Sequence, residues 1–192
     1  ADTFTVETAG VERVRFNSSG KILVGSDTLR NITSSASSGI LQIEGTAANT
    51  SSAALINNQN DAKSSVLYFA KTRGSATGAV TTVANGDKLG SIRFAGADGT
   101  DLENGTAAIR AIVNGTVAGN QIPTDITFET SATNGSSIAE RLRITSGGNV
   151  GINEINPTNP LVVKQSSANI NLELHSTSSG RGTQIMTHND HA

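Results

Sequence analysis

The residues best able to do chemistry are four carboxyl groups in polar stretches near the middle of the chain. They are Asp87, Asp98, Asp101 and Glu103. Hydrolysis of a glycosidic bond uses two carboxyl groups, one as an acid and the other as a base or nucleophile. Calcium also binds to carboxylate oxygens, but the spacing of these four residues is not that of a known calcium loop.

Two of these acids have a simpler structural explanation. Asp87 and Asp98 each adjoin a glycine in turn-like sequences, where an aspartate side chain accepts hydrogen bonds from the backbone. An aromatic platform for sugar stacking is also missing, because the chain has no tryptophan and Tyr68 is its one tyrosine. We therefore expect a protein that is not an enzyme and has no catalytic residues.

Other reactive groups are scarce. The chain has no cysteine, which excludes disulfides, thiolate metal sites and thiol redox chemistry. No Gly-x-Ser-x-Gly motif marks a serine nucleophile. His188 and His191 lie close to the last residue, but residues three apart point to opposite sides of a strand. We expect a polar chain end there, and neither a metal nor a cofactor.

The composition points to a core that one chain cannot complete. Serine, threonine, asparagine and glycine make up 83 of the 192 residues, and aromatic residues make up 3%. Disorder is not favoured, because charged residues are 16%, prolines number three, and β-branched residues recur in alternating runs. The net charge of -2 does not favour nucleic acid or an anionic membrane as a partner. No apolar run approaches the roughly 20 residues that span a bilayer.

The two-residue alternation of β-strands runs through most of the chain, and no segment has a convincing helical period. Asn-Gly and Asp-Gly pairs, which favour turns, separate many of these segments. Strands are expected at 4–6, 11–16, 21–24, 40–44, 53–57, 66–71, 89–95, 107–113, 125–130, 138–145, 161–164, 170–175 and 183–187. The fold class is therefore all-β.

An internal repeat organises these strands. Residues 11–22 align with residues 139–150 through a shared Glu-Arg-apolar-Arg-apolar pattern followed by Ser and Gly, and residues 4–8 align with 126–130. A three-stranded module therefore occurs twice. The expected domains are a β-stalk module at 1–37, a β-sandwich-like middle domain at 38–138, and a second β-stalk module with C-terminal strands at 139–192.

The repeated Glu-Arg-x-Arg pattern has two explanations. Guanidinium groups bind carboxylates and phosphates well, so the motif could clamp an anionic glycan. The alternative is a set of cross-strand charge pairs on a solvent-facing side of the sheet, and occurrence in both modules favours this structural role. The residues concerned are Glu12, Arg13 and Arg15 in the first copy, and Glu140, Arg141 and Arg143 in the second.

Several segments resemble the tail fibre and tailspike family of bacteriophages. Residues 139–152, followed by Asn156-Pro157 and an apolar 161–163, are similar to a module often found before a cleaved intramolecular chaperone. The segments 67–74, 86–100, 113–116 and 128–130 fit the same pattern, so the likeness covers residues 38–165. No such chaperone is recognised before Ala192.

This resemblance implies an elongated homotrimer, in which β-prism or triple β-helix-like stalks flank a β-sandwich-like knob. It also implies an extracellular place on the virion, where the segment attaches the particle to a bacterial host. The expected partners are other copies of the chain, further virion tail or baseplate proteins, and a host surface glycan or lipopolysaccharide. A polysaccharide-depolymerising tailspike and a non-viral bacterial adhesin or filament remain the alternatives.

Polar loops are the expected sites of receptor contact. The longest of them fall at residues 75–87, 97–104 and 116–121. The candidate contact residues are Thr77, Asn85, Asp87, Asp98, Asp101 and Asn120.

Overall fold

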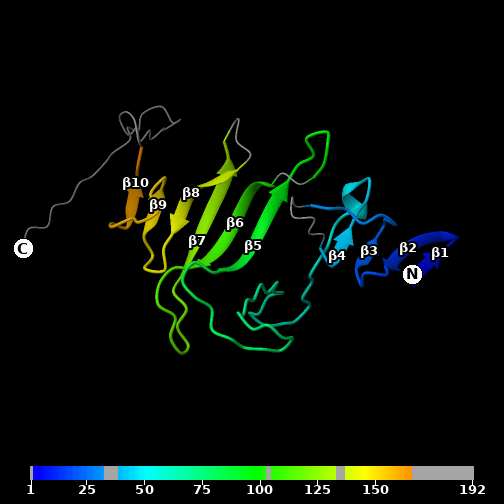
Figure 1. Cartoon of the computed structure of the whole chain (residues 1–192), viewed down its shortest axis with the longest axis horizontal. Coiled ribbons are helices and arrows are strands. Elements are labelled where there is room, and N and C mark those ends of the chain that lie inside the picture. Colours follow the sequence, from blue (N-terminus) through cyan, green and yellow to red (C-terminus); the bar gives the residue numbers. More distant parts are fainter. Residues whose placement is uncertain (1, 33–38, 103–104, 133–136, 166–192) are drawn as a thin grey trace, which may run out of the picture.

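Two β-sheets arranged along an elongated molecule make up the fold (Figure 1). The computed structural model describes residues 2–32, 39–102, 105–132 and 137–165. The first sheet has the order β1-β2-β3-β4, with strands Phe4–Thr8, Val11–Phe16, Ile22–Val24 and Leu41–Ile43. The second has the order β10-β9-β8-β7-β6-β5, with strands Leu161–Val163, Val150–Ile152, Ile138–Ile144, Thr124–Ser131, Gly105–Val113 and Lys88–Ala95.

All-β structure is confirmed for the described residues. Their one helical element is the short 3-10 turn η1, Ala48–Thr50. None of their helices is long or apolar enough to cross a membrane.

The internal repeat is visible in the structure, where β7–β10 repeat the arrangement of β1–β4. In both copies the last two strands pair in parallel and all other neighbours pair antiparallel. A β-bulge interrupts the first pair of each copy at the same place, after Val6 and after Phe128. A bulge bends a strand and increases its twist. The two copies therefore share their local shape as well as their strand order, and each has a fourth, parallel strand beyond the three expected.

The turn after the second strand of each copy is also the same. In the first copy Asn17 N donates to Lys21 O at 3.0 Å, and in the second Thr145 N donates to Asn149 O at 2.9 Å. The side chain of the first residue in each turn accepts further backbone hydrogen bonds, Asn17 from Lys21 N and Thr145 from Asn149 N, both at 3.0 Å. Asparagine and threonine thus serve as equivalent turn-forming residues.

Both domain boundaries expected from the sequence fall inside a sheet. β4 lies beyond residue 37 but pairs with β3, and β8 lies largely beyond residue 138 but pairs with β7. The middle of the chain therefore contributes β5–β7 to a sheet that β8–β10 complete. Within the described part of one chain, these strands form a single six-stranded sheet and not two packed sheets of a sandwich.

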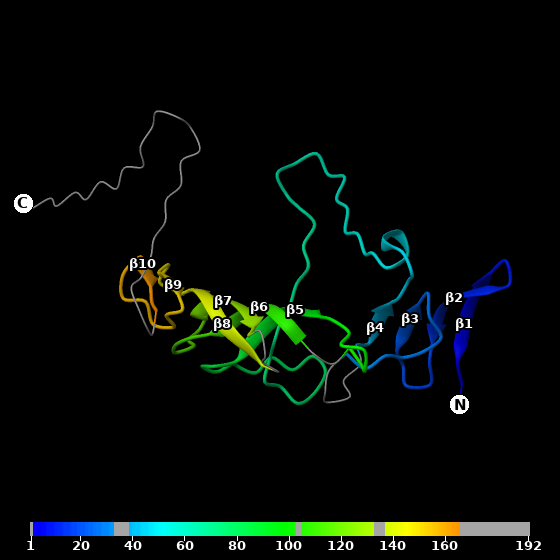
Figure 2. The same ribbon diagram turned by 90° about the horizontal axis from the view of Figure 1, so that it is seen from above.

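Two expected strands, at 53–57 and 66–71, are not strands in this structure. Both belong to a long segment, residues 51–70, which we call the extension. It leaves the body of the molecule between the two sheets and returns to β5 (Figure 2). A strand requires a hydrogen-bonded neighbour, and no backbone–backbone hydrogen bond joins residues 51–72 to the rest of the described chain. The expected strands at 170–175 and 183–187 lie outside the described residues.

One face of the second sheet is apolar across all six strands. The strand register aligns two rows of residues on this face. The first row is Ile92, Ile109, Phe128, Leu142, Ile152 and Val163, and the second is Gly90, Ala111, Ile126, Ile144, Val150 and Leu161. Six large side chains in these rows are exposed, and three of them, Ile92, Phe128 and Leu161, are 48%, 38% and 60% exposed. We call this surface the apolar face.

The opposite face carries a network of ion pairs. Arg143 joins two carboxylates, donating from Nη1 to Asp125 at 2.7 Å and from Nη2 to Glu140 at 2.6 Å. Arg110 pairs with Glu129, whose other carboxylate oxygen accepts from the Thr127 hydroxyl at 3.1 Å. No buried side-chain nitrogen or oxygen of the described residues lacks a hydrogen-bond partner. We call this surface the charged face.

The burial of the two faces is the reverse of the usual pattern. Antiparallel sheets commonly turn an apolar face to the core and a polar face to water. Here Asp125 and Thr127 on the charged face are 0% exposed. In the described residues, the buried apolar side chains are Leu23, Val83, Ala108 and Val113. The described part of one chain therefore leaves the apolar face of this sheet exposed.

Two backbone segments approach closely at Gly151 in β9, and a substitution there tests how tightly they pack. A methyl group added at this buried residue would lie 2.0 Å from the Glu154 carbonyl oxygen. We expect Gly151→Ala to destabilise the protein by about 1–3 kcal/mol, because the backbone must move to relieve the overlap. Thermal unfolding followed by circular dichroism measures the effect.

Gly147→Ala is the matched control for this substitution. Its added methyl group would lie 3.8 Å from the Thr145 hydroxyl, an ordinary contact, so the melting temperature should stay close to that of the unmodified protein. Equal melting temperatures for both variants would contradict the packing described at β9.

Candidate interaction groove

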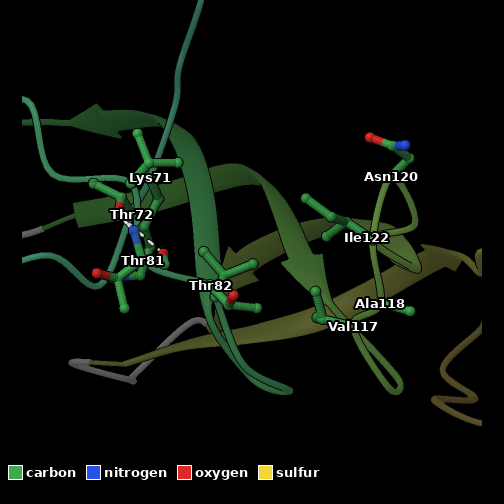
Figure 3. A pocket seen from close by; sticks show the side chains of 11 residues that line it. Lys71, Thr72, Thr81, Thr82, Val117, Ala118, Asn120 and Ile122 are labelled. Atoms are coloured by element: carbon green, nitrogen blue, oxygen red, sulfur yellow. Dashed lines mark hydrogen bonds between the residues drawn. The ribbon is translucent and has the colours of Figure 1, made fainter.

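Two of the three predicted contact loops enclose a groove of about 790 Å³. One wall is formed by residues 71–72 and 80–83, and the other by the hairpin at 117–122. Figure 3 shows Thr72, Thr81 and Thr82 on one side and Val117, Asn120 and Ile122 on the other. The volume lies within the roughly 300–1,000 Å³ range of small-molecule sites.

Hydrogen bonds between two threonines hold the first wall together. The Thr72 hydroxyl accepts from Thr81 N at 2.7 Å and donates to Thr81 O at 3.0 Å (Figure 3). Arg73 N also donates to Thr81 O, at 3.1 Å. These bonds keep the segments before and after the 75–78 turn side by side, so the wall keeps its shape without belonging to a sheet.

A tight hairpin forms the second wall. Ala118 and Gln121 exchange two backbone hydrogen bonds of 3.0 Å, which encloses Gly119 and Asn120 in a two-residue turn. Asn120 has φ 61, in the left-handed region that asparagine adopts more readily than most residues. The turn therefore fixes Asn120 at the tip of the hairpin, where its side chain is exposed at the groove.

Both walls are anchored at the end of β6. Val113 N donates to Asp87 O and Gly86 N donates to Val113 O, both at 2.8 Å. Gly115 N donates to the side-chain oxygen of Asn85 at 2.8 Å. One wall continues into residues 84–87 and the other begins after residue 113, so these bonds set the spacing between the walls.

Asp87 supports the first wall electrostatically. Its carboxylate accepts two hydrogen bonds from Arg73, at 2.7 and 2.9 Å, and one from Ala84 N at 2.9 Å. The Arg73 bonds are the main cause, and the Ala84 bond the next, of a pKa for Asp87 held far below its usual value. A carboxyl group that stays ionised in this way suits a structural anchor and not a proton donor.

The groove offers hydrogen bonding and apolar contact in roughly equal measure. Lys71 supplies a cation, the threonines supply hydroxyls, and Asn120 supplies an amide, while Val80, Val117 and Ile122 supply apolar surface. None of the lining residues carries a carboxyl group. The groove thus combines hydrogen-bonding groups with apolar surface, and its lining lacks the carboxyl pair that glycoside hydrolysis uses.

The predicted contact residues divide between structural and exposed positions. Asn85 and Asp87 anchor the groove walls through the bonds given above. Thr77 lies in the exposed 75–78 turn, and Asn120 lines the groove. The groove residues that sequence analysis did not single out include Lys71, which it placed in a strand.

The third predicted loop lies elsewhere in the molecule. Residues 97–102 contribute, with residues 28–31, to a second hollow of about 550 Å³. Asp98 accepts from Thr100 N at 2.8 Å and from Asp101 N at 3.2 Å, as expected for a turn-forming aspartate. Among the described residues, no group of three or more potential metal ligands gathers at one place. Glu103, His188 and His191 lie outside those residues.

The Glu-Arg-x-Arg motif forms ion pairs within one strand in each copy. Arg15 contacts Glu12 at 2.6 Å, and the corresponding Arg143 contacts Glu140 at 2.6 Å. The bulge in each module brings residues three apart onto one side of the strand, which the alternation of a regular strand would not do. A cross-strand pair exists in the second copy, between Arg143 and Asp125. These guanidinium groups are occupied by protein carboxylates.

Comparisons with known proteins give matches among solved structures but none among sequences. No protein family matches the sequence, and no curated protein does so either. The solved structure of the carboxy-terminal domain of the bacteriophage T5 L-shaped tail fibre has a TM-score of 0.57 with this chain at 14% sequence identity. The match covers 93% of this chain and 73% of the T5 chain. The chain therefore has a fold similar to that of a phage tail fibre domain.

Acid should weaken the first groove wall through Asp87. Because folding lowers this pKa, the ion pair with Arg73 stabilises the protein above the unfolded-state pKa of about 3.9. That stabilisation is lost as the pH falls through this value toward the folded-state pKa. Asp87→Asn should therefore lower the melting temperature near about pH 7, with a difference from the unmodified protein that shrinks toward about pH 2.

Arg73→Gln removes the other partner and should give the same pH profile, which provides an internal control. Melting-temperature differences that are independent of pH for both variants would contradict this role of the ion pair.

Proposed function

We propose that this chain is a structural and receptor-binding segment of a phage tail fibre, which works as an extracellular homotrimer and helps attach the virion to its bacterial host. The observation that carries the proposal is the uncovered apolar face of the second sheet. The similarity of the fold to a tail fibre domain supports the same conclusion. The tail fibre resemblance in the sequence supplies the number of copies.

A homotrimer accounts for the reversed burial of the sheet. A core built from so few buried apolar side chains leaves little stabilisation against the conformational entropy of the chain. Three apolar faces turned toward a common axis would cover one another and leave the charged faces outside. Stability would then depend on assembly, as in other obligate oligomers.

The first sheet has the features needed for the same arrangement. Its register aligns Phe4, Phe16, Ile22 and Leu41 in one apolar row. The rings of Phe4 and Phe16 lie 5.8 Å apart, and both side chains are exposed in one chain. Three such sheets around an axis would form a β-prism-like stalk, so both modules would trimerise by the same contacts.

Attachment would use the loops that remain outside the trimer. The groove between residues 71–83 and 117–122 combines a cation, hydroxyl groups and an amide, which suit a surface glycan or lipopolysaccharide. Three grooves in each fibre and several fibres in each particle would raise avidity above the affinity of a single site. The remaining parts of the chain would join it to other virion tail or baseplate proteins.

Two other functions remain alternatives. A depolymerising tailspike would need a carboxyl pair, which the groove does not contain. A non-viral bacterial adhesin or filament could use the same trimer, and genes for baseplate proteins beside the coding sequence would argue against it.

Sedimentation equilibrium tests the trimer directly. We expect the purified chain to sediment with the mass of three 19.6 kDa subunits. Phe128→Asp should convert the trimer to monomers or abolish folding, because it buries a charge among three apolar faces. Thr77→Asp adds the same charge to an exposed turn and should leave the mass unchanged. A folded monomer of the unmodified chain would overturn the proposal.

Binding assays test the attachment role. Lys71→Ala and Asn120→Ala should each weaken retention on purified lipopolysaccharide or capsular polysaccharide from a strain that the unmodified trimer binds. Loss of one hydrogen bond corresponds to a reduction of about 2–10-fold at each site. Unchanged retention of trimeric variants would remove the groove as the contact site. Release of reducing ends during the same incubation would favour the depolymerase.

A further inference from the structure

The extension, residues 51–70, is the largest feature that the fold of one chain does not explain. It contains no strand or helix, although loops longer than about 12–15 residues without regular structure are uncommon in compact domains. Its tip is a turn in which Asn57 Nδ2 donates to Lys63 O at 3.3 Å. Two extended legs connect this turn to the body of the molecule (Figure 2).

The legs carry apolar side chains that no other part of the described chain covers. Leu55 and Ile56 lie on the outgoing leg, 62% and 79% exposed. Val66, Leu67 and Tyr68 lie on the returning leg, 53%, 65% and 83% exposed. Exposed apolar groups that gather on one feature mark interaction surfaces.

The order of these residues shows that both sides of each leg are apolar. Successive side chains of an extended segment point in opposite directions. Residues 66–69 are four consecutive apolar residues, and Leu55 and Ile56 are adjacent. A segment that lay on a protein surface would alternate apolar and polar residues, whereas a continuous apolar run is typical of strands covered on both sides. The legs therefore suit a place between two apolar surfaces.

One of these surfaces belongs to the same chain. A methyl group added at Gly90 would lie 2.4 Å from Cβ of Phe69, so the side chain of Phe69 lies directly against β5. Residues 67–69 line a hollow of about 350 Å³ together with Ile92, Ile109 and Ile126 of the apolar face. Phe69 thus faces its own sheet, whereas Tyr68, which also lines this hollow, remains 83% exposed and is left without cover by the described part of the chain.

We propose that the second surface is the apolar face of a neighbouring copy, so that the extension of each chain is inserted between its own second sheet and that of the next chain. This inference rests on the trimer proposed above and adds the element that makes the contact. A second copy is the partner that fits, because both the extension and the apolar face are exposed in the described part of the same chain. A second copy therefore covers both at once, and no further partner is required.

The length of the extension agrees with this arrangement. The returning leg runs eight residues from Asp61 in the turn to Phe69 at the sheet. Fully extended, it spans about 26 Å at about 3.3 Å per residue. The six strands of the second sheet span about 24 Å at about 4.8 Å between neighbours. One leg is thus long enough to cross the whole apolar face of a neighbour.

Photo-cross-linking of the full chain tests the insertion. Tyr68 is replaced by benzoylphenylalanine, which keeps an aromatic ring at this exposed position, and the same residue is placed at Leu55 in a second protein. Irradiation should yield covalent dimers and trimers on denaturing gels. Peptide mapping of the dimer band should locate the adducts on β6–β9 of the second chain. Benzoylphenylalanine at Thr77 is the control, and should give monomers only.

Sedimentation of the same proteins before irradiation separates the two proposals. A trimer whose adducts lie within single chains, or outside the second sheet of the partner, would overturn the insertion and leave the fibre segment intact. A monomer would overturn both.

Discussion

The register between β7 and β8 determines which residues face which side of the second sheet, and Arg143 is the residue that fixes it. Its guanidinium group reaches Asp125 on the neighbouring strand and Glu140 on its own strand at the same time. A shift of one residue would exchange the faces of a strand and place charged side chains among Ile109, Phe128 and Leu142. The cost of burying an unpaired charge makes such a shift unfavourable. The ion pairs on the charged face thus maintain the strand register that forms the apolar face on the opposite side of the sheet. The proposed assembly depends on that apolar face.

The proposed assembly explains why the chain has few aromatic residues and many small polar ones. Side chains with little apolar surface cannot build a deep core between two layers of one subunit. A flat row of Ile, Val, Leu and Phe residues needs only a matching surface on a second copy, and each sheet presents such rows. Serine, threonine and asparagine then serve the turns and the groove walls, as Asn17, Thr72 and Thr145 do. In the proposed assembly few aromatic residues are required, because burial would take place between chains.

The sequence was sufficient to predict most features that depend on local interactions, such as strands and turns. The repeat and the strands of both sheets other than β9 follow from alternation and from turn residues, and the structure confirms them; β9, Val150–Ile152, was not among the expected strands. The strands expected at 53–57 and 66–71 have the correct extended shape but no neighbour in the chain, because a strand is defined by a partner that alternation cannot identify. The bulges after Val6 and Phe128 were also not predictable, and they turn an apparent cross-strand motif into pairs within a strand. In the groove, Asn120 was expected as a contact residue from the length and polarity of its loop, whereas Lys71 was not, because a wall held by Thr72 and Thr81 leaves no periodic signal.

The duplicated module also bears on how such a molecule can change over time. Both copies contain the same bulge, the same turn geometry and the same parallel last strand. Each copy is therefore a repeat unit that begins and ends in the same way. In the proposed fibre, recombination that adds or removes one unit would alter the length in whole steps and preserve the register of every remaining strand. Selection for reach could therefore proceed separately from selection for recognition, since the groove loops lie in the segment between the two copies and are not part of either one's repeated pattern.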